Sequence, residues 1–379
     1  MIVVGVGAMG AATCAQLAAR GARVLGLERF AIPHELGSSG GDTRLFRTAY
    51  FEHPDYVPLL RRARAGWAEL EAAAGRRVFH ETGLLYAGRA DGPLIADTLA
   101  SARAYGVSIQ EVDDAPHRFP WFRLPEGFAA LFEPGGGLVL AAHAVEAFAD
   151  VAREAGAVLR EGEVVRAWTA HASGVRVETD HDAYEGGYLV LTAGPWTAPL
   201  APSLASRLRV TRQVLGWFEP EGVDRFAPPS FPCWAIEDPE DGLYYGFPSI
   251  PGDVPGPTRA GLKVGLHVPG PTADPDAMDR TPSAADEAAF GPGLSRYVPA
   301  IAGPPTAMRV CLYTNTPDGD FLVGRLPGED RVVIACGFSG HGFKFAPVIG
   351  EALADLALEG ATALPLGFLD PGRPLSAGS

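Results

Sequence analysis

The chain has 379 residues, of which 47% are hydrophobic and 20% are charged, and its formal net charge is −14 with a pI near 5.1. This length exceeds what one hydrophobic core serves, so we expect two domains, and the composition excludes a disordered chain. The acidic balance argues against a nucleic-acid partner, because phosphate backbones bind basic faces.

Membrane and metal partners are not expected either. No apolar run approaches the roughly 20 residues that span a bilayer, and the N-terminus lacks the charged and apolar regions of a secretory signal. The four cysteines are far apart and form no CxxC pair, so neither a disulfide framework nor a metal site is predicted. We therefore expect a cytoplasmic protein with free thiols and no metal.

The chain begins with a predicted nucleotide-binding unit. A β-branched strand at 2–4 leads into Gly5-Val6-Gly7-Ala8-Met9-Gly10, a helical rhythm that stops at Gly21, and a second strand at 23–27 before Glu28. Such glycines let a pyrophosphate approach the helix N-terminus, and the acid accepts hydrogen bonds from the adenosine ribose. We interpret the unit as a dinucleotide site; the alternative is a Gly-rich turn in an ordinary α/β domain. An acid at the strand end disfavours NADP.

A second segment distinguishes FAD from NAD. The strand-like run 187–193 ends at Gly194-Pro195-Trp196 and resembles the turn by which flavoproteins close over the dinucleotide. The alternative is a buried strand that ends in a Gly-Pro turn. A mobile NAD would need only the first unit and a neighbouring half, so this segment favours FAD.

Lysine is almost absent from the chain. Lys263 and Lys344 are the two lysines among 31 lysine and arginine residues, and each lies in a Gly-rich, otherwise apolar run. An ammonium group is compact and can lose its proton, whereas a guanidinium stays charged. We therefore expect both lysines to take part in chemistry. The alternative is codon bias, which would leave the last lysines in exposed polar segments.

Three further runs carry a resemblance to a known family. They are GSSGGDTRLFRTAY at 37–50, GLYYGFPS at 242–249 with GLKVGLH at 261–267, and CLYTNTPDGDF at 311–321 with CGFSGHGFKF at 336–345. In this order and spacing, the chain resembles the monomeric sarcosine oxidase and N-methyltryptophan oxidase family, whose members are FAD enzymes with the D-amino-acid-oxidase-like fold. The similarity runs from Met1 to the region before the C-terminal tail at 371–379, which we expect to be loose.

The resemblance implies roles for the residues that match family motifs. Arg47 and Lys344 match the pair that grips the substrate carboxylate, and Lys263 matches the lysine that promotes reaction with oxygen. His267 matches a histidine at the amine end of the substrate, and shares a face with Lys263 if both lie on one strand. Cys311 matches the cysteine that forms a thioether to the flavin. Without the resemblance, a lone cysteine there is more often a small buried hydrophobe.

Other matching positions support the flavin and the substrate. Tyr313 and either Tyr244 or Tyr245 match aromatic groups at the substrate site, with strand packing as the alternative. Arg44 can favour anionic reduced flavin, and only glycine at 340–342 lets main chain approach the flavin ring. The implied cofactor-binding residues are Gly5, Gly7, Ala8, Met9, Gly10, Glu28, Arg29, Ser38, Thr43, Arg44, Val165, Ala193, Gly194, Trp196, Cys311, Gly340, Gly342 and Lys344.

The chain also departs from the family pattern. Family members usually carry two histidines where this chain has Ser39 and Gly40, and the second bears on covalent flavin attachment, so we expect the thioether at Cys311 less firmly than the FAD site itself. The Pro-rich stretch at 250–260 is extra and is expected to be a surface loop. Ala235 replaces a bulkier residue, which leaves the size of the substrate open.

These observations together predict an α/β protein. A discontinuous Rossmann-like FAD-binding domain at 1–78, 140–213 and 317–379 alternates with a second domain of mostly antiparallel β-sheet, at 79–139 and 214–316, that roofs the flavin. We expect a monomer that oxidises a secondary amino acid, first of all sarcosine, with O2 to glycine, formaldehyde and hydrogen peroxide. The alternatives are a bulkier N-alkyl or cyclic substrate, a dehydrogenase with another electron acceptor, and a flavin-bound sensor without catalysis.

Overall fold

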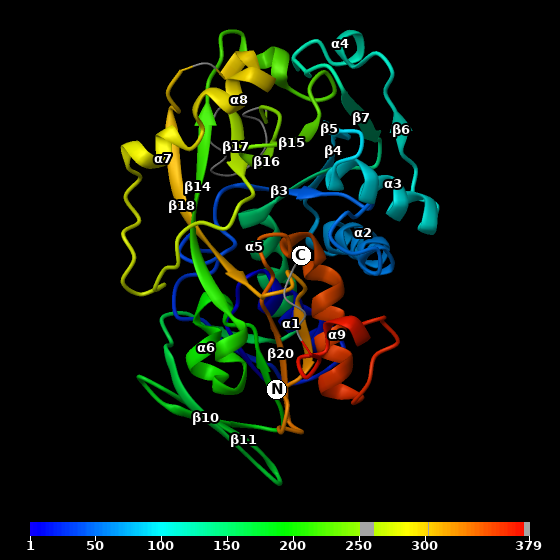
Figure 1. The fold of residues 1–379 in the computed structure, drawn as a ribbon. Coiled ribbons are helices and arrows are strands. Elements are labelled where there is room, and N and C mark those ends of the chain that lie inside the picture. Colours follow the sequence, from blue (N-terminus) through cyan, green and yellow to red (C-terminus); the bar gives the residue numbers. More distant parts are fainter. Residues whose placement is uncertain (251–260, 302, 375–379) are drawn as a thin grey trace.

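The computed structural model describes residues 1–250, 261–301 and 303–374 (Figure 1). The proline-rich insert expected at 250–260 lies, apart from Ile250, outside the described residues, and so does the end of the expected tail. None of the helices in the described ranges combines the length and apolar character needed to cross a membrane.

A mostly parallel sheet of six strands forms the lower half of the molecule in Figure 1. Its strand order is β19-β20-β13-β1-β2-β9, and only β19 runs antiparallel to its neighbour. The β1, β13 and β20 strands are fully buried runs of apolar residues, as strands covered on both faces are. The bounds of these strands are β1 Ile2–Val4, β2 Leu25–Leu27, β9 Val158–Arg160, β13 Leu189–Leu191, β19 Leu322–Arg325 and β20 Val332–Cys336.

Three helices pack together on this sheet: α1 (Ala8–Ala19), α5 (Ala141–Glu154) and α9 (Ala346–Leu358). A Cβ added at Gly10 would lie 1.9 Å from the backbone oxygen of Gly5, so only glycine allows α1 to approach the β1 turn so closely. Because α1 begins directly after this turn, its N-terminus is held at the carboxyl end of β1.

A second, eight-stranded sheet forms the upper half of the molecule (Figure 1). Its order is β18-β14-β17-β16-β15-β5-β7-β6, and every neighbouring pair is antiparallel except β15 with β5. An aromatic-rich core packs against it. The strand bounds are β5 Leu84–Arg89, β6 Gln110–Glu111, β7 Phe128–Glu133, β14 Arg209–Phe218, β15 Cys233–Asp238, β16 Gly242–Gly246, β17 Leu262–Leu266 and β18 Ala307–Asn315.

Two small sheets and six further helices complete the described fold. An antiparallel sheet, β10-β11-β12, projects below the parallel sheet, and a three-stranded sheet, β3-β8-β4, lies between the two large sheets (Figure 1). The strand bounds are β3 Thr43–Phe46, β4 Phe79–Glu81, β8 Gly137–Leu140, β10 Val165–His171, β11 Gly174–Thr179 and β12 Ala183–Gly186. The helix bounds are α2 Tyr56–Ala74, α3 Pro93–Tyr105, α4 Ala115–Arg118, α6 Thr197–Leu200, α7 Ala284–Ala288 and α8 Gly291–Tyr297.

The strands of the two large sheets alternate along the chain. The parallel sheet takes its strands from 1–78, 140–213 and 317–379, and the eight-stranded sheet takes most of its strands from 79–139 and 214–316. Strand β14 crosses the boundary expected at 213, because its ten residues pair continuously with β18 and β17. The division of the chain into two domains at those boundaries stays a proposal.

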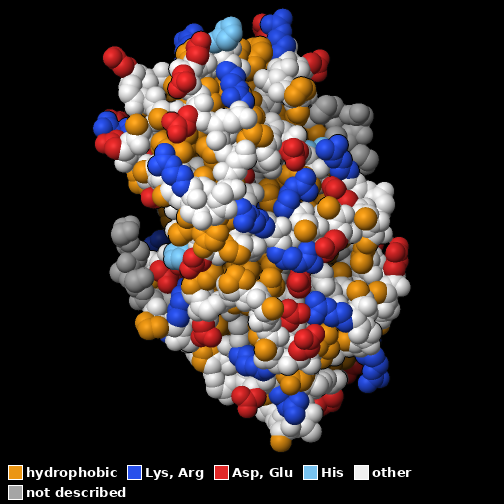
Figure 2. All heavy atoms as spheres, turned by 90° about the vertical axis from the view of Figure 1, so that its right-hand side faces the viewer, with side chains coloured by type: hydrophobic (Ala, Val, Ile, Leu, Met, Phe, Trp, Pro, Cys, Tyr) orange, Lys and Arg blue, Asp and Glu red, His pale blue; other side chains and the backbone are white. Residues whose placement is uncertain are grey.

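The face formed by α2, α3 and α9 carries both acidic and basic side chains, which are mixed over its surface (Figure 2).

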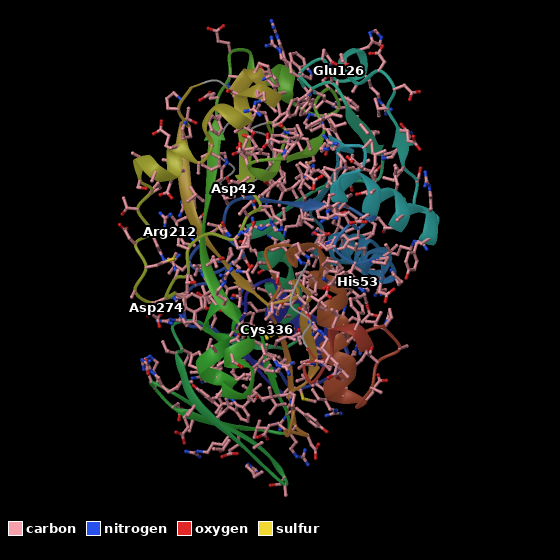
Figure 3. All side chains as sticks on the ribbon, in the orientation of Figure 1. Asp42, His53, Glu126, Arg212, Asp274 and Cys336 are labelled. Carbon is pink, nitrogen blue, oxygen red and sulfur yellow. The ribbon has the colours of Figure 1, made fainter. Side chains whose placement is uncertain are left out.

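The long segment between β17 and α7 descends from the eight-stranded sheet toward the parallel sheet, with Asp274 near its lower end (Figure 3). Asp276 in this segment accepts a hydrogen bond from Trp196 at 2.8 Å and pairs with Arg29 at 2.7 Å. These contacts connect the two halves of the molecule.

Candidate active site

A cavity of about 380 Å³ lies at the carboxyl ends of β1, β2 and β13. This is where open α/β sheets bind ligands. It is lined by 14 of the residues expected to bind the cofactor, namely Gly5, Gly7, Ala8, Met9, Glu28, Arg29, Ser38, Arg44, Val165, Ala193, Gly194, Trp196, Gly340 and Gly342.

The turn at the N-terminus of α1 suits a pyrophosphate. Gly5 has a φ of +85°, which glycine adopts without strain. The N-cap residue Gly7 has no side chain to cap the helix, and the one side-chain contact at its first residue is a long hydrogen bond of 3.4 Å from Ala8 N to Ser39 Oγ. Glu28 is buried and accepts hydrogen bonds from Val6 N at 2.7 Å and Phe30 N at 3.0 Å, so its carboxylate is fixed at the end of β2. The open helix terminus and the fixed acid fit an adenine dinucleotide.

Two buried polar atoms on the wall of this cavity lack a hydrogen-bond partner among the described residues. They are Glu163 Oε2 and Thr314 Oγ1, and each belongs to a residue at least nine-tenths buried. Because an unsatisfied buried polar group costs free energy, these atoms are suited to a polar ligand. Sequence reasoning missed both residues, since Glu163 belongs to no recognisable motif and Thr314, although it lies in the run at 311–321, was given no role there.

Four of the expected cofactor residues do not line this cavity. Gly10 faces Gly5 inside the turn, and Thr43 is buried with its oxygen atoms turned toward Lys263. Cys311 and Lys344 line a second cavity instead. The first cavity also has wall residues that the sequence did not single out, among them His34, Val164, Arg166, Asp276 and Leu312, and Ser39 lines it as well.

The second cavity, of about 80 Å³, adjoins the first, because Arg44, Tyr313, Gly340 and Phe343 line both. It therefore lies next to one end of the larger cavity, beneath the eight-stranded sheet. Its remaining lining residues are Leu45, Arg47, Phe51, Glu52, Leu215, Ala235, Leu243, Tyr245, Phe247, His267, Cys311, His341 and Lys344.

Arg47 is buried in the wall of the second cavity and forms an ion pair with Glu52. Its guanidinium lies 4.1 Å from the ring centroid of Tyr50 and 4.0 Å from that of Phe51. Burial disfavours the Arg47 charge, but Glu52, Tyr50 and Tyr86 together outweigh that effect and raise the pKa of Arg47. Burial alone would raise the pKa of Glu52, yet the Arg47 charge lowers it to about 2. Sequence reasoning missed Glu52.

Lys344 is also buried at this cavity, on the 3-10 turn Phe343–Phe345. Its Nζ donates to the backbone oxygen of His341 at 2.6 Å and to Tyr50 Oη at 3.3 Å. Burial and then the nearby Arg47 charge lower the pKa of Lys344 well below its ordinary value. Arg47 and Lys344, which lie 297 positions apart in the chain, thus meet at one cavity.

Lys263 lies on β17 behind the cavities and lines neither of them. Its Nζ donates to Thr43 O at 2.6 Å and to Thr43 Oγ1 at 3.3 Å, and lies 4.5 Å from the ring centroid of Phe247. Burial, followed by the Arg44 charge, lowers the pKa of Lys263 well below its ordinary value. Asp42, which precedes Thr43, lies between the two large sheets (Figure 3) and has a φ of +61°.

Arg44 holds the loop before β3. Its guanidinium donates to four backbone oxygens of that loop, including those of Ser38 and Thr43, both at 2.8 Å. A Cβ at Gly40 would lie 3.0 Å from the backbone oxygen of Glu35, which is tighter than most side chains allow. A side chain at position 40 would therefore require Glu35 to shift slightly.

His267 follows directly after β17, whose last residue is Leu266, so it is not on the strand with Lys263. Its Nδ1 lies 3.3 Å from Tyr313 Oη, while its backbone N donates to Leu243 O at 2.7 Å. Burial lowers the pKa of His267 to about 4, so its ring is neutral near pH 7. His267 and Tyr245 both line the second cavity, whereas Tyr244 lines neither cavity.

Cys311 is a buried residue of β18, and burial raises the pKa of its thiol. It lines the second cavity, whereas Cys14, Cys233 and Cys336 line neither. No group of three or more potential metal ligands occurs in the described ranges.

Comparison with known proteins defines the family. Residues 1–356 match the FAD dependent oxidoreductase family, also called DAO. The chain belongs to this family. The resemblance to sarcosine oxidase and N-methyltryptophan oxidase is confirmed by the relatives described next.

Curated relatives align over nearly the whole of this FAD-dependent oxidoreductase. Monomeric sarcosine oxidase of Streptomyces avermitilis is 41% identical over 377 residues, which cover 98% of this chain and 97% of that protein. N-methyl-L-tryptophan oxidase of Salmonella arizonae is 35% identical over 365 residues, which cover 95% and 94%. The chain is thus an amine-oxidising flavoenzyme with FAD as its cofactor.

The fold is also found among solved structures. NikD, described as an unusual amino acid oxidase essential for nikkomycin biosynthesis, matches in its open form with a TM-score of 0.85 and 29% identity. The match covers 100% of this chain and 98% of that one. The predicted mixture of a Rossmann-like half with a β-rich half is therefore confirmed as the fold of this family.

Proposed function

We propose that this enzyme is an oxidase of secondary amino acids, with sarcosine as the first substrate to test and O2 as the electron acceptor. One observation carries the proposal: two buried cations, Arg47 and Lys344, and a neutral histidine, His267, meet in a small cavity that shares four wall residues with the dinucleotide cavity. A small anionic amine is the ligand that such a set of groups suits.

The two cations would bind the substrate carboxylate. Arg47 supplies a planar pair of N–H donors and Lys344 a compact second charge. Glu52 competes with the substrate for Arg47, so binding requires that this ion pair open or be shared. Because the cavity is buried, each contact acts in a low dielectric and is stronger than it would be in water.

At the other end of the substrate, neutral His267 would accept a hydrogen bond from the amine. Tyr313 Oη lies 3.3 Å from His267 Nδ1, and this contact orients the His267 ring. When bound, FAD would supply a two-electron acceptor for oxidation of the C–N bond to an imine and a reductant for O2. Water then hydrolyses the imine product, which for sarcosine gives glycine and formaldehyde, while O2 becomes hydrogen peroxide.

Lys263 would act in the oxygen half of the reaction. Its ammonium is held by Thr43 behind the wall that both cavities share, where it can stabilise negative charge that develops on oxygen. This role differs from that of Lys344, and the two lysines can be tested against each other because no other lysine occurs in the chain.

We also propose that the FAD is covalently attached through Cys311, as an 8α-S-cysteinyl link. Two observations bear on this proposal. Cys311 lines the cavity next to the dinucleotide site, which supports the link, whereas glycine at position 40 leaves the loop without the histidine usual in the resembling family.

We also propose that the enzyme acts as a monomer in the cytoplasm. Light scattering after gel filtration measures the mass of the protein in solution and so tests whether it is a monomer.

A bulkier substrate is the second candidate, and Ala235 favours it. This small residue lines the second cavity beside Leu243 and Tyr245, so space is available where a larger side chain would close it. The substrates to compare are N-methyl-L-tryptophan and a cyclic amino acid such as pipecolate. Ala235→Leu should then reduce turnover of the bulky substrate more than turnover of sarcosine.

Anaerobic addition of sarcosine to the purified holoenzyme tests the proposal. Bleaching of the flavin absorption, followed by hydrogen peroxide on admission of air, supports the oxidase. Bleaching only with larger amines moves the substrate to the second candidate. Bleaching without peroxide, together with fast reduction of an artificial dye, would identify a dehydrogenase with another acceptor. A flavin that no amine reduces would contradict the proposed function.

A further inference from the structure

A chain of buried hydrogen bonds lies behind Lys344. Its Nζ donates to Tyr50 Oη at 3.3 Å, and Tyr50 Oη lies 2.6 Å from His341 Nδ1. The other ring nitrogen, His341 Nε2, lies 3.1 Å from the backbone oxygen of Gly319. Tyr50, His341 and Lys344 are each more than nine-tenths buried, so water does not compete for these contacts.

The direction of each bond in this chain is determined by its last acceptor. The backbone oxygen of Gly319 can only accept, so His341 Nε2 carries the hydrogen. Burial lowers the pKa of His341 to about 3, so the ring is neutral and Nδ1 has to accept. Tyr50 therefore donates to His341, and its oxygen lone pair is left to accept from Lys344.

The consequence for Lys344 is a fixed orientation of its amine. Protonated Lys344 has three N–H donors at Nζ. One of them donates to Tyr50 Oη and one to the backbone oxygen of His341. The third donor is left for a ligand in the second cavity, which Lys344 and His341 line. Tyr50 lines neither cavity and cannot touch such a ligand directly.

We propose that Tyr50 and His341 are positioning residues that hold the Lys344 amine toward the second cavity, and that they thereby set the affinity of the enzyme for a carboxylate ligand. The inference rests on the carboxylate-binding role proposed above for Lys344. Tyr50 acts on Lys344 through its hydroxyl group. Its ring makes a separate contact with the Arg47 guanidinium, which lies 4.1 Å from the ring centroid.

Titration of the holoenzyme with acetate, followed by the change in flavin absorption, tests this inference. Tyr50→Phe keeps the ring under Arg47 and removes only the hydroxyl. We expect it to weaken acetate binding about fivefold to tenfold, as the loss of one hydrogen bond does. Lys344→Met should weaken binding further, and adding Tyr50→Phe to Lys344→Met should then change nothing. Additive effects of the two substitutions would overturn the inference.

Tyr56→Phe is the matched control. Tyr56 is as deeply buried as Tyr50, and their ring centroids lie 5.1 Å apart. Its hydroxyl accepts a hydrogen bond from Phe321 N at 3.1 Å, and it lines neither cavity. We expect acetate to bind this variant as it binds the unaltered enzyme. An equal loss in both variants would mean that loosened packing, and not the hydroxyl of Tyr50, controls the affinity.

The scarcity of lysine provides a readout that needs no ligand. Labelling the holoenzyme with lysine enriched in ¹⁵N at Nζ yields two side-chain signals, one from Lys263 and one from Lys344. Lys344→Met assigns them by deleting one. Tyr50→Phe should shift the Lys344 signal and leave that of Lys263 in place. If the Lys344 signal does not move, the hydrogen-bond chain does not act on its amine and the inference is overturned.

The two proposals fail in different ways. If Lys344→Met binds acetate as tightly as the unaltered enzyme, Lys344 is not a carboxylate ligand, and the proposed function loses that contact. If Lys344→Met weakens acetate binding but Tyr50→Phe leaves both the affinity and the Lys344 signal unchanged, the carboxylate site stands and only the positioning role is overturned.

Discussion

Arg47 and Glu52 form an ion pair in the wall of the second cavity, and Glu52 Oε2 has no hydrogen-bond partner among the described residues. The cation expected to bind a substrate carboxylate is therefore already bound to a carboxylate of the protein. The ion pair keeps the buried guanidinium neutralised when no substrate is present, since an unpaired buried charge costs several kcal/mol.

Removal of the Glu52 charge should strengthen carboxylate binding. In Glu52→Gln, Arg47 keeps a hydrogen-bond acceptor but no longer a competing anion, so we expect acetate to bind the holoenzyme about tenfold more tightly. Flavin absorption titration measures the affinity. Glu126→Gln is the control, because Glu126 is an exposed residue at the upper edge of the molecule (Figure 3). Unchanged or weaker binding by Glu52→Gln would show that Arg47 is not a carboxylate ligand.

The two lysines should affect different halves of the reaction. We expect Lys263→Met to slow reoxidation by O2 about 10²-fold to 10³-fold, the usual loss when a preorganised charge-stabilising group is removed, and to change anaerobic reduction by less than about tenfold. Lys344→Met should instead raise the substrate concentration needed for reduction and leave reoxidation nearly intact. Stopped-flow absorption measures both steps. Equal losses in both steps for Lys263→Met would contradict the role given to it.

Covalent attachment can be tested through the cysteines. If Cys311 holds the flavin, acid precipitation of the unaltered enzyme leaves the yellow colour in the pellet, and Cys311→Ser releases it to the supernatant. Cys336→Ala, which removes a buried thiol that lines neither cavity, should behave like the unaltered enzyme. Release of flavin from the unaltered enzyme would show that binding is noncovalent, in keeping with glycine at position 40.

Stability should fall in mild acid because of two buried histidines. The pKa values of His267 and His341 are lowered to about 4 and about 3, so below pH 6.5 the unfolded chain binds protons that the folded protein does not. Each histidine should cost about 2 kcal/mol at pH 5 relative to pH 7. Denaturant unfolding at several pH values measures this loss.

His267→Gln should make that pH dependence shallower, since it removes one of the two groups. His117→Gln, at an exposed position outside both cavities, should leave the slope unchanged. A slope between pH 5 and 6.5 that neither the His267 nor a corresponding His341 substitution reduces would show that other groups control acid stability.

Local sequence was sufficient to predict the dinucleotide site. The glycines of the first turn and Glu28 act within one strand–helix–strand unit, so their spacing reports backbone geometry directly. The structure places Gly5, Gly7 and Glu28 around one cavity. His267 would share a face with Lys263 if both lay on one strand, but the strand ends one residue before His267, and the two side chains have different partners.

Residues that depend on distant partners were not predictable. Glu52 is only five positions from Arg47, yet nothing in the sequence indicates that both are buried in one wall. Glu163 and Asp276 line the dinucleotide cavity without belonging to any motif, and Thr314 lines it from within the run 311–321, whose sequence does not single it out.

By itself, the sequence determined the family, the cofactor and the two lysines that are most informative to substitute, because these follow from motifs whose meaning is local or is shared with relatives. Only the tertiary structure decided which groups face one another. Tyr50 and His341 reach Lys344 across 294 and 3 positions of the chain, and Arg47 pairs with Glu52 beside them. The physical reason is that burial and hydrogen-bond partners arise from the packing of the two sheets, which no single segment encodes.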